Sequence, residues 1–169
     1  MLPTHLFLIG MTGGGKSTLG KRLASNLNLR FVDTDQRVSE MMGLPEYDII
    51  KQFGEAFYRN AESGVLMELI GEPPCIVSTG GGLPTAKENV QLMQNHGIII
   101  YIDRPLDQLL ADARMDQRSG PDALSHDEIV AQYNQRVGYY RACADYTLEN
   151  AHGLVVGLAN LTALVENIR

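Results

Sequence analysis

The strongest chemical signal in the chain lies near its N-terminus, where residues 10–17 read GMTGGGKS and fit the phosphate-binding pattern GxxxxGK[ST]. Glycines let backbone N–H groups curve around a phosphate without Cβ clashes, and the following helix N-terminus adds partial positive charge. We expect Lys16 to reach the β- and γ-phosphates of ATP and the Ser17 hydroxyl to ligate Mg²⁺. The alternative is a structural glycine-rich turn, but a predicted strand precedes this loop and a predicted helix follows it, as phosphate binding requires. The predicted ATP-binding residues of the loop are Gly13, Gly14, Gly15, Lys16, Ser17 and Thr18.

Two carboxylates follow the second predicted strand, in the stretch FVDTD at residues 31–35. The carboxyl ends of parallel strands face the ligand crevice, so both acids are expected to point toward the phosphates. Residues two apart in an extended chain share a face, which predicts that Asp33 and Asp35 lie side by side. Such close like charges need a cation, which predicts Asp33 near Mg²⁺ and Asp35 near an acceptor hydroxyl. The alternative for Asp35 is helix capping.

An arginine and a glutamate lie three residues apart in a predicted helix that opens with GEAFYRNAE at residues 54–62. Arg59 and Glu62 therefore share a helix face, so Glu62 can orient the guanidinium to bind a carboxylate with two parallel hydrogen bonds. A solvated surface pair is the alternative.

Three glycines, Gly80, Gly81 and Gly82, directly follow the third predicted strand. They allow close backbone approach by a ligand, or they form a simple turn.

A second arginine lies on the inward stripe of a later predicted helix, which Ile129, Tyr133, Arg136 and Tyr140 define by steps of four, three and four. A buried cation needs an anionic partner. For Arg136 that partner is either a substrate carboxylate or a neighbouring acid such as Asp35.

The elements that must position these residues alternate between short apolar runs and amphipathic stretches. The apolar runs lack alternation, which is typical of strands buried on both faces, and the alternation of strands with helices predicts an α/β fold with a doubly wound parallel sheet. The predicted strands cover 6–9, 30–32, 75–78, 98–102 and, more weakly, 146–148; the predicted helices include 16–26, 56–70, 86–95, 106–114 and 157–168. Residues 115–124 are polar, contain Gly-Pro and predict a surface loop, after which Ser125 and Glu128 form a capping box for a helix to about residue 143.

Length and composition predict one domain over residues 1–169 and exclude some function classes. The formal net charge is −6 and no Lys/Arg run occurs, which argues against nucleic-acid binding. The N-terminus offers neither a signal peptide nor a membrane span, so we expect a cytoplasmic protein. Cys75 and Cys143 are expected to be buried free thiols rather than a disulfide, and the four histidines are expected at the surface.

Taken together, the motifs resemble the shikimate kinase family. The phosphate-binding loop, the Phe-x-Asp-x-Asp strand end, the Gly-Glu…Tyr-Arg-x-x-Glu helix, the Thr-Gly-Gly-Gly turn and the stretch RVGYYRACAD at 136–145 occur in that family's order and spacing. The likeness extends from residue 7 to about 148. It implies a fold like that of nucleoside monophosphate kinases, with strand order 2-3-1-4-5, a substrate-binding segment at about 34–62 and a lid at about 114–125.

The resemblance also implies roles for particular residues. It implies that Asp35 binds the substrate hydroxyls and acts as base, that Asp33 lies near Mg²⁺, and that Arg59, Arg136 and Gly80 to Gly82 hold shikimate. A lid arginine contacts both substrates in this family, usually within Arg-Pro-Leu-Leu, a sequence that this chain lacks. Counting back from Arg136 favours Arg118 as that arginine, whereas matching on Gly-Pro-Asp at 120–122 leaves the role unassigned. Arg114 corresponds to the family's residue near adenine.

The predicted function is therefore phosphoryl transfer from ATP to the 3-hydroxyl of shikimate, by a protein that is expected to be a monomer. Catalysis is assigned to Lys16, Asp35 and Arg118, because a loose transition state needs positioning and charge neutralisation. Two alternatives remain open: a kinase for another small hydroxylated acid such as gluconate, and a nucleotide-binding regulatory module without turnover.

Overall fold

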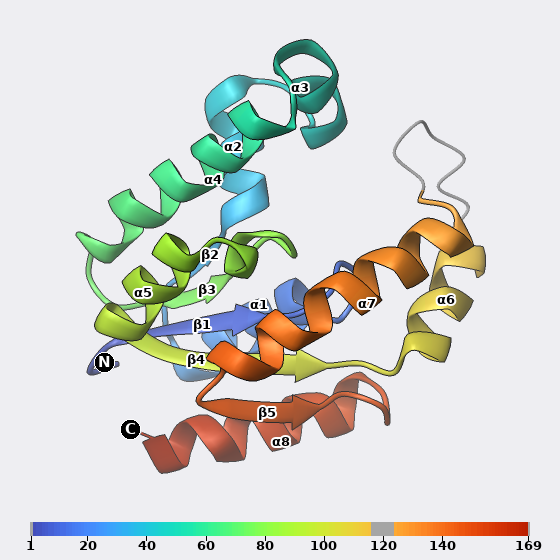
Figure 1. Ribbon diagram of the computed structural model, residues 1–169. Coiled ribbons are helices and arrows are strands. Elements are labelled where there is room, and N and C mark those ends of the chain that lie inside the picture. The colour runs from blue at the N-terminus through green and yellow to red at the C-terminus, as the bar shows by residue number, and fades with distance from the viewer. Residues whose placement is uncertain (1, 116–123, 169) are drawn as a thin grey trace.

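A five-stranded parallel sheet forms the centre of the molecule in the computed structural model, which describes residues 2–115 and 124–168, without the side chains of Arg114 and Met115 (Figure 1). The strand order is β2-β3-β1-β4-β5, and every neighbouring pair is parallel. The strands are β1 (His5–Ile9), β2 (Phe31–Asp33), β3 (Ile76–Ser78), β4 (Gly97–Asp103) and β5 (Tyr146–Glu149). This confirms the predicted sheet and strand order.

Helices occupy the connections between these strands, as parallel crossovers require. They are α1 (Lys16–Leu27), α2 (Thr34–Met42), α3 (Glu46–Phe53), α4 (Glu55–Ile70), α5 (Lys87–His96), α6 (Leu106–Met115), α7 (His126–Cys143) and α8 (Leu154–Ile168), with a 3₁₀ turn, η1 (Leu83–Thr85). The predicted capping box is present at the start of α7, where Ser125 accepts from the Glu128 N–H and Glu128 accepts from the Ser125 N–H.

Strands β1 to β4 send alternate side chains to two separate hydrophobic cores, whereas β5 contributes only Leu148, to one of them. Phe7 and Ile9 of β1 pack into one core with apolar residues of α4, α5 and α7. Leu6 and Leu8 pack into the other core with residues of α1 and α8. Because helices cover both faces, β1 is buried throughout, which explains why the strand sequences show no polar alternation.

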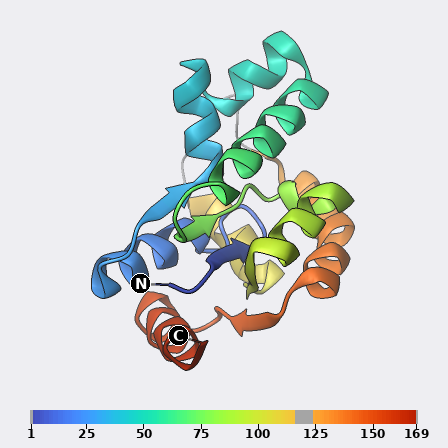
Figure 2. The ribbon, with the colours of Figure 1, turned by 90° about the vertical axis from the view of Figure 1, so that its left-hand side faces the viewer.

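A lobe made of α2, α3 and α4 extends from one end of the sheet, as Figures 1 and 2 show from two directions. Neither α2 nor α3 was predicted from the sequence. Residues 34–53 form two short helices separated by Gly43, which adopts a left-handed φ of 67°, and by Pro45. The first of these helices begins where β2 ends.

The prediction that Asp33 and Asp35 share an extended strand is therefore wrong. Asp33 is the last residue of β2 and the N-cap of α2, since its Oδ1 accepts a hydrogen bond of 3.1 Å from the Gln36 N–H. Asp35 lies in the first turn of the helix, so the capping considered for Asp35 belongs to Asp33. Aspartate competes well for backbone N–H groups at a helix start, which ends the strand here.

The predicted surface position of the histidines is also wrong for one of them. His5 lies within β1 and is buried, and its Nδ1 accepts a hydrogen bond from the Cys75 N–H at 3.3 Å. Burial lowers the pKa of His5, which favours the neutral ring that this acceptor role requires. Cys75 and Cys143 are both buried and free, as predicted. Within residues 2–115 and 124–168, no helix combines the length and apolar character needed to cross a bilayer.

Candidate active site

The loop between β1 and α1 has the backbone of an anion-binding cradle. Gly13 and Gly15 adopt φ values of 81° and 95°, which side-chain-bearing residues rarely take. The Lys16 side chain is only 6% exposed, and its Nζ donates to the carbonyls of Gly10 (2.8 Å) and Met11 (2.7 Å). Burial lowers the pKa of Lys16 to about 8, opposed by the nearby carboxylates of Asp35 and Asp33. An anionic ligand would favour the charged ammonium in the same way.

Oxygen ligands gather beside this loop, in a cavity of about 240 Å³ that contains Lys16, Ser17, Asp33 and Asp35. The Ser17 hydroxyl donates to Asp33 Oδ2 and lies 3.0 Å from the Ser78 hydroxyl. Hydroxyl and carboxylate oxygens are suitable ligands for Mg²⁺. The two predicted metal-binding residues are thus in direct contact.

A larger cavity of about 650 Å³ lies between the α2–α4 lobe and α7, and Asp35 lines both cavities. Arg59 and Glu62 enter it from α4, and Arg136 enters it from α7. Among the described residues Arg136 forms no ion pair with a carboxylate, Asp35 included, so the neighbouring-acid alternative finds no support there. A guanidinium in this position can bind an anionic group of a ligand.

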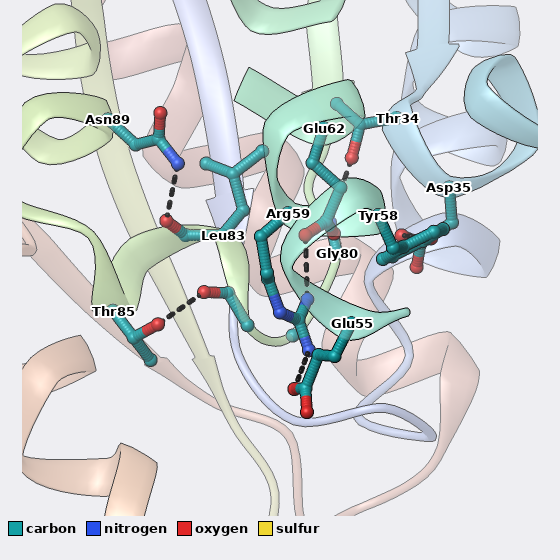
Figure 3. Close-up of polar contacts among 12 residues, drawn as sticks. Thr34, Asp35, Glu55, Tyr58, Arg59, Glu62, Gly80, Leu83, Thr85 and Asn89 are labelled. Atoms are coloured by element: carbon teal, nitrogen blue, oxygen red, sulfur yellow. Dashed lines mark hydrogen bonds and ion pairs between the residues drawn. The ribbon is translucent and has the colours of Figure 1, made fainter. Parts of the chain in front are cut away.

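Arg59 is held by two acids of its own helix, Glu62 at 2.6 Å and Glu55 at 3.3 Å (Figure 3). Glu62 is 1% exposed, and its second oxygen, Oε1, has no hydrogen-bond partner among the described residues. Burial raises the pKa of Glu62 to about 7, although the Arg59 guanidinium lowers it. The pair is therefore not a solvated surface contact, and Glu62 fixes the guanidinium at the cavity wall.

The three glycines after β3 make room for these side chains. A Cβ on Gly82 would lie 2.5 Å from Arg59 Nη1, and one on Gly81 would lie 3.0 Å from Arg136 Nη1. A Cβ on Gly80 would overlap the carboxylates of Glu62 and Asp35. Close approach by a ligand stays a prediction, since Gly81 and Gly82 line the larger cavity, and the structure adds that the protein's own charged groups also approach here.

Replacing Gly80 by alanine should therefore lower kcat by about tenfold or more, because a displacement of about 1 Å in a catalytic group costs up to about 10²-fold. Gly64→Ala is the matched control, since a Cβ on Gly64 in α4 meets nothing within 4 Å. Steady-state kinetics of both variants, with their melting temperatures, would check this. Equal kcat values for Gly80→Ala and wild type would show that the carboxylates tolerate displacement.

A third cavity of about 190 Å³ adjoins the phosphate loop and involves residues that the sequence analysis missed. Arg104 after β4 donates to the Gly13 carbonyl at 2.8 Å, and Asn150 after β5 donates to the Gly14 carbonyl at 2.9 Å. Both support the loop from the carboxyl ends of strands. Their position two residues after the ends of predicted strands is the signal that could have identified them.

The structure does not describe the side chains of two predicted residues. Arg118 lies outside the described residues, as does most of the predicted lid. Arg114 lies in α6, but its side chain is not among those described.

The sheet order, the glycine-rich loop that opens α1 and the adjoining cavity with two arginines are the features of a P-loop kinase. A family model described as shikimate kinase matches residues 12–159. The chain is 36% identical over 151 residues to a shikimate kinase of Clostridium beijerinckii, covering 88% of this chain and 87% of the relative. It is also 36% identical over 150 residues to one of Neisseria gonorrhoeae, covering 87% and 88%. The chain therefore belongs to the shikimate kinase family, whose members are ATP-dependent kinases.

Solved structures agree with this assignment. A shikimate kinase from Acinetobacter baumannii in complex with shikimate superposes with a TM-score of 0.83 at 26% identity, covering 97% of this chain and 94% of that one. A shikimate kinase from Bacteroides thetaiotaomicron gives a TM-score of 0.85 at 27% identity, covering 96% and 98%.

Proposed function

We propose that this protein transfers the γ-phosphoryl group of ATP to the 3-hydroxyl of shikimate, giving shikimate 3-phosphate and ADP. The observation that carries the proposal is the pair of guanidiniums, Arg59 and Arg136, in the cavity that Asp35 links to the phosphate loop. A hydroxylated acid needs cations for its carboxylate and a carboxylate for its hydroxyl, and this cavity offers both. An uncharged sugar would leave Arg136 without an anionic partner among the described residues, and it would offer Arg59 no anion beyond Glu55 and Glu62 of its own helix.

In this proposal the nucleotide phosphates lie over residues 13–18, and Lys16 neutralises charge on the β- and γ-phosphates. Asp35 orients the acceptor hydroxyl and takes its proton as the new O–P bond forms. The cavity beside Arg104 and Asn150 would take the nucleoside. The segment at about 34–62 would bind the acceptor, and residues at about 114–125, with Arg118, would close over both ligands.

Ser17 and Asp33 would hold Mg²⁺ together with phosphate oxygens and water, since two protein oxygens are too few for an octahedral cation. The bound ion would neutralise negative charge on the transferring phosphoryl group.

ADP release measured with ATP, Mg²⁺ and a panel of acceptors tests the proposed function. We expect turnover with shikimate and background turnover with gluconate, which has a carboxylate and hydroxyls but no ring. Turnover with gluconate alone would favour the other metabolite kinase. ATP binding without turnover on any acceptor would favour the regulatory module.

A further inference from the structure

Tyr58 is completely buried in α4, and its hydroxyl has no role in the proposed phosphoryl transfer. This hydroxyl donates a hydrogen bond of 2.8 Å to Asp35 Oδ1 in α2, 23 positions earlier in the chain (Figure 3). Burial and the nearby Asp35 charge raise the pKa of Tyr58 far above its ordinary value. The hydroxyl therefore keeps its proton and acts as a donor at any working pH.

Besides Tyr58, the only group among the described residues that hydrogen-bonds the Asp35 carboxylate is Glu62, which can donate only when it is protonated. Lys16, a cation that interacts electrostatically with Asp35, has its Nζ bonded to the carbonyls of Gly10 and Met11. Asp35 Oδ2 receives no donor from the described residues. One carboxylate oxygen is thus fixed by the protein, and the other is available to a ligand.

A second carboxylate makes this anchor necessary. Glu62 Oε1, the buried oxygen without a partner, and Asp35 Oδ1 lie on the same side of Gly80, where a Cβ would touch both. Whenever Glu62 is ionised, the two carboxylates repel each other, which would turn Asp35 away from the α4 wall. The Tyr58 hydroxyl opposes that rotation, because a hydrogen bond to an ionised acceptor is stronger than one between neutral groups.

We propose that Tyr58 is a positioning residue whose hydroxyl holds Asp35 Oδ1 and thereby directs Oδ2 at the acceptor hydroxyl. The inference rests on the proposed function, since it assigns Asp35 the contact with the reacting oxygen. Tyr58 itself touches neither substrate in this account. It acts through the carboxylate that does.

Tyr58→Phe removes only the hydroxyl and should lower kcat with shikimate by about 10- to 100-fold, the usual effect of one hydrogen bond to a charged group. The dissociation constants for ATP and shikimate should change by less than about threefold, because phosphate and carboxylate contacts are made elsewhere. Steady-state kinetics and direct binding of each ligand separate the two effects. A merely structural hydroxyl would change the melting temperature without this split.

Tyr101→Phe is the matched control. Tyr101 is also buried, and its hydroxyl likewise donates to an aspartate, Asp103 Oδ1, at 3.0 Å, but Tyr101 lines none of the three cavities above. We expect its kcat to stay within about twofold of wild type. If Tyr58→Phe and Tyr101→Phe give equal kcat values, the inference is wrong.

A double-mutant cycle keeps the test decisive if Tyr58→Phe loses stability. In an Asp35→Ala background no carboxylate remains to be held, so adding Tyr58→Phe should change the residual single-turnover rate by less than about twofold. A further loss of about tenfold in that background would overturn the inference while leaving the proposed function intact. Wild-type protein without shikimate-dependent turnover would overturn both.

Discussion

Replacing Asp35 by asparagine should lower shikimate-dependent kcat by about 10²- to 10⁴-fold, the range that general-base catalysis contributes. Asparagine has nearly the same shape, and its amide oxygen can still accept the hydrogen bond from Tyr58, so the local structure should persist. The amide cannot take the proton of the acceptor hydroxyl. ATP affinity should remain close to that of wild type, because the phosphate loop is unchanged.

Asp48→Asn is a suitable control for this variant, since Asp48 lies in α3 of the same lobe and lines none of the three cavities. Its kcat should equal that of wild type. Near-normal turnover of Asp35→Asn would remove Asp35 from the catalytic role.

Replacing Arg59 by alanine should weaken shikimate binding by about 2–5 kcal/mol, the usual cost of removing one partner from a buried charge pair. ATP binding should be little affected, because Arg59 lines the larger cavity and not the one at the phosphate loop. Isothermal titration with each ligand would measure both affinities. An unchanged shikimate affinity would show that the arginine does not grip the acceptor.

The same change should also lower the free energy of unfolding, since it leaves the buried Glu62 carboxylate without its cation. Loss of Arg59 raises the pKa of Glu62 further above about 7, so protonation offsets part of this cost at neutral pH. The double variant Arg59→Ala/Glu62→Gln removes the stranded charge and should recover stability without recovering shikimate affinity. Arg37→Ala is the matched control: the Arg37 side chain is as exposed as that of Arg59, but its partner Glu72 is 27% exposed.

The sheet and the phosphate loop could be predicted from the sequence because both depend on local patterns. Strands covered on both faces need continuous apolar runs, and a loop with φ values such as those of Gly13 and Gly15 needs glycine. The α2–α3 lobe was missed because its helices are short, with nine and eight residues, and apolar spacing is a dependable helix signal only over longer segments. At the end of β2, an aspartate is compatible both with a continuing extended chain and with a helix N-cap. In the structure Asp33 is the N-cap of α2.

The candidate site was predictable as a set of residues but not as a set of contacts. Spacing within one helix indicated the Arg59–Glu62 pair, which the structure contains. The hydrogen bond from Tyr58 to Asp35 joins two helices. The space beside Gly80 is filled by the carboxylates of Glu62 from α4 and Asp35 from α2. Such contacts depend on tertiary packing, for which one sequence carries no periodic signal.

A crystal structure with a non-hydrolysable ATP analogue, Mg²⁺ and shikimate would test the central claim most directly. We expect the triphosphate to lie over residues 13–17 and the shikimate carboxylate to lie between Arg59 and Arg136. The 3-hydroxyl should lie against Asp35 Oδ2. A triphosphate bound away from the loop, or a shikimate carboxylate turned away from both arginines, would contradict the proposed function.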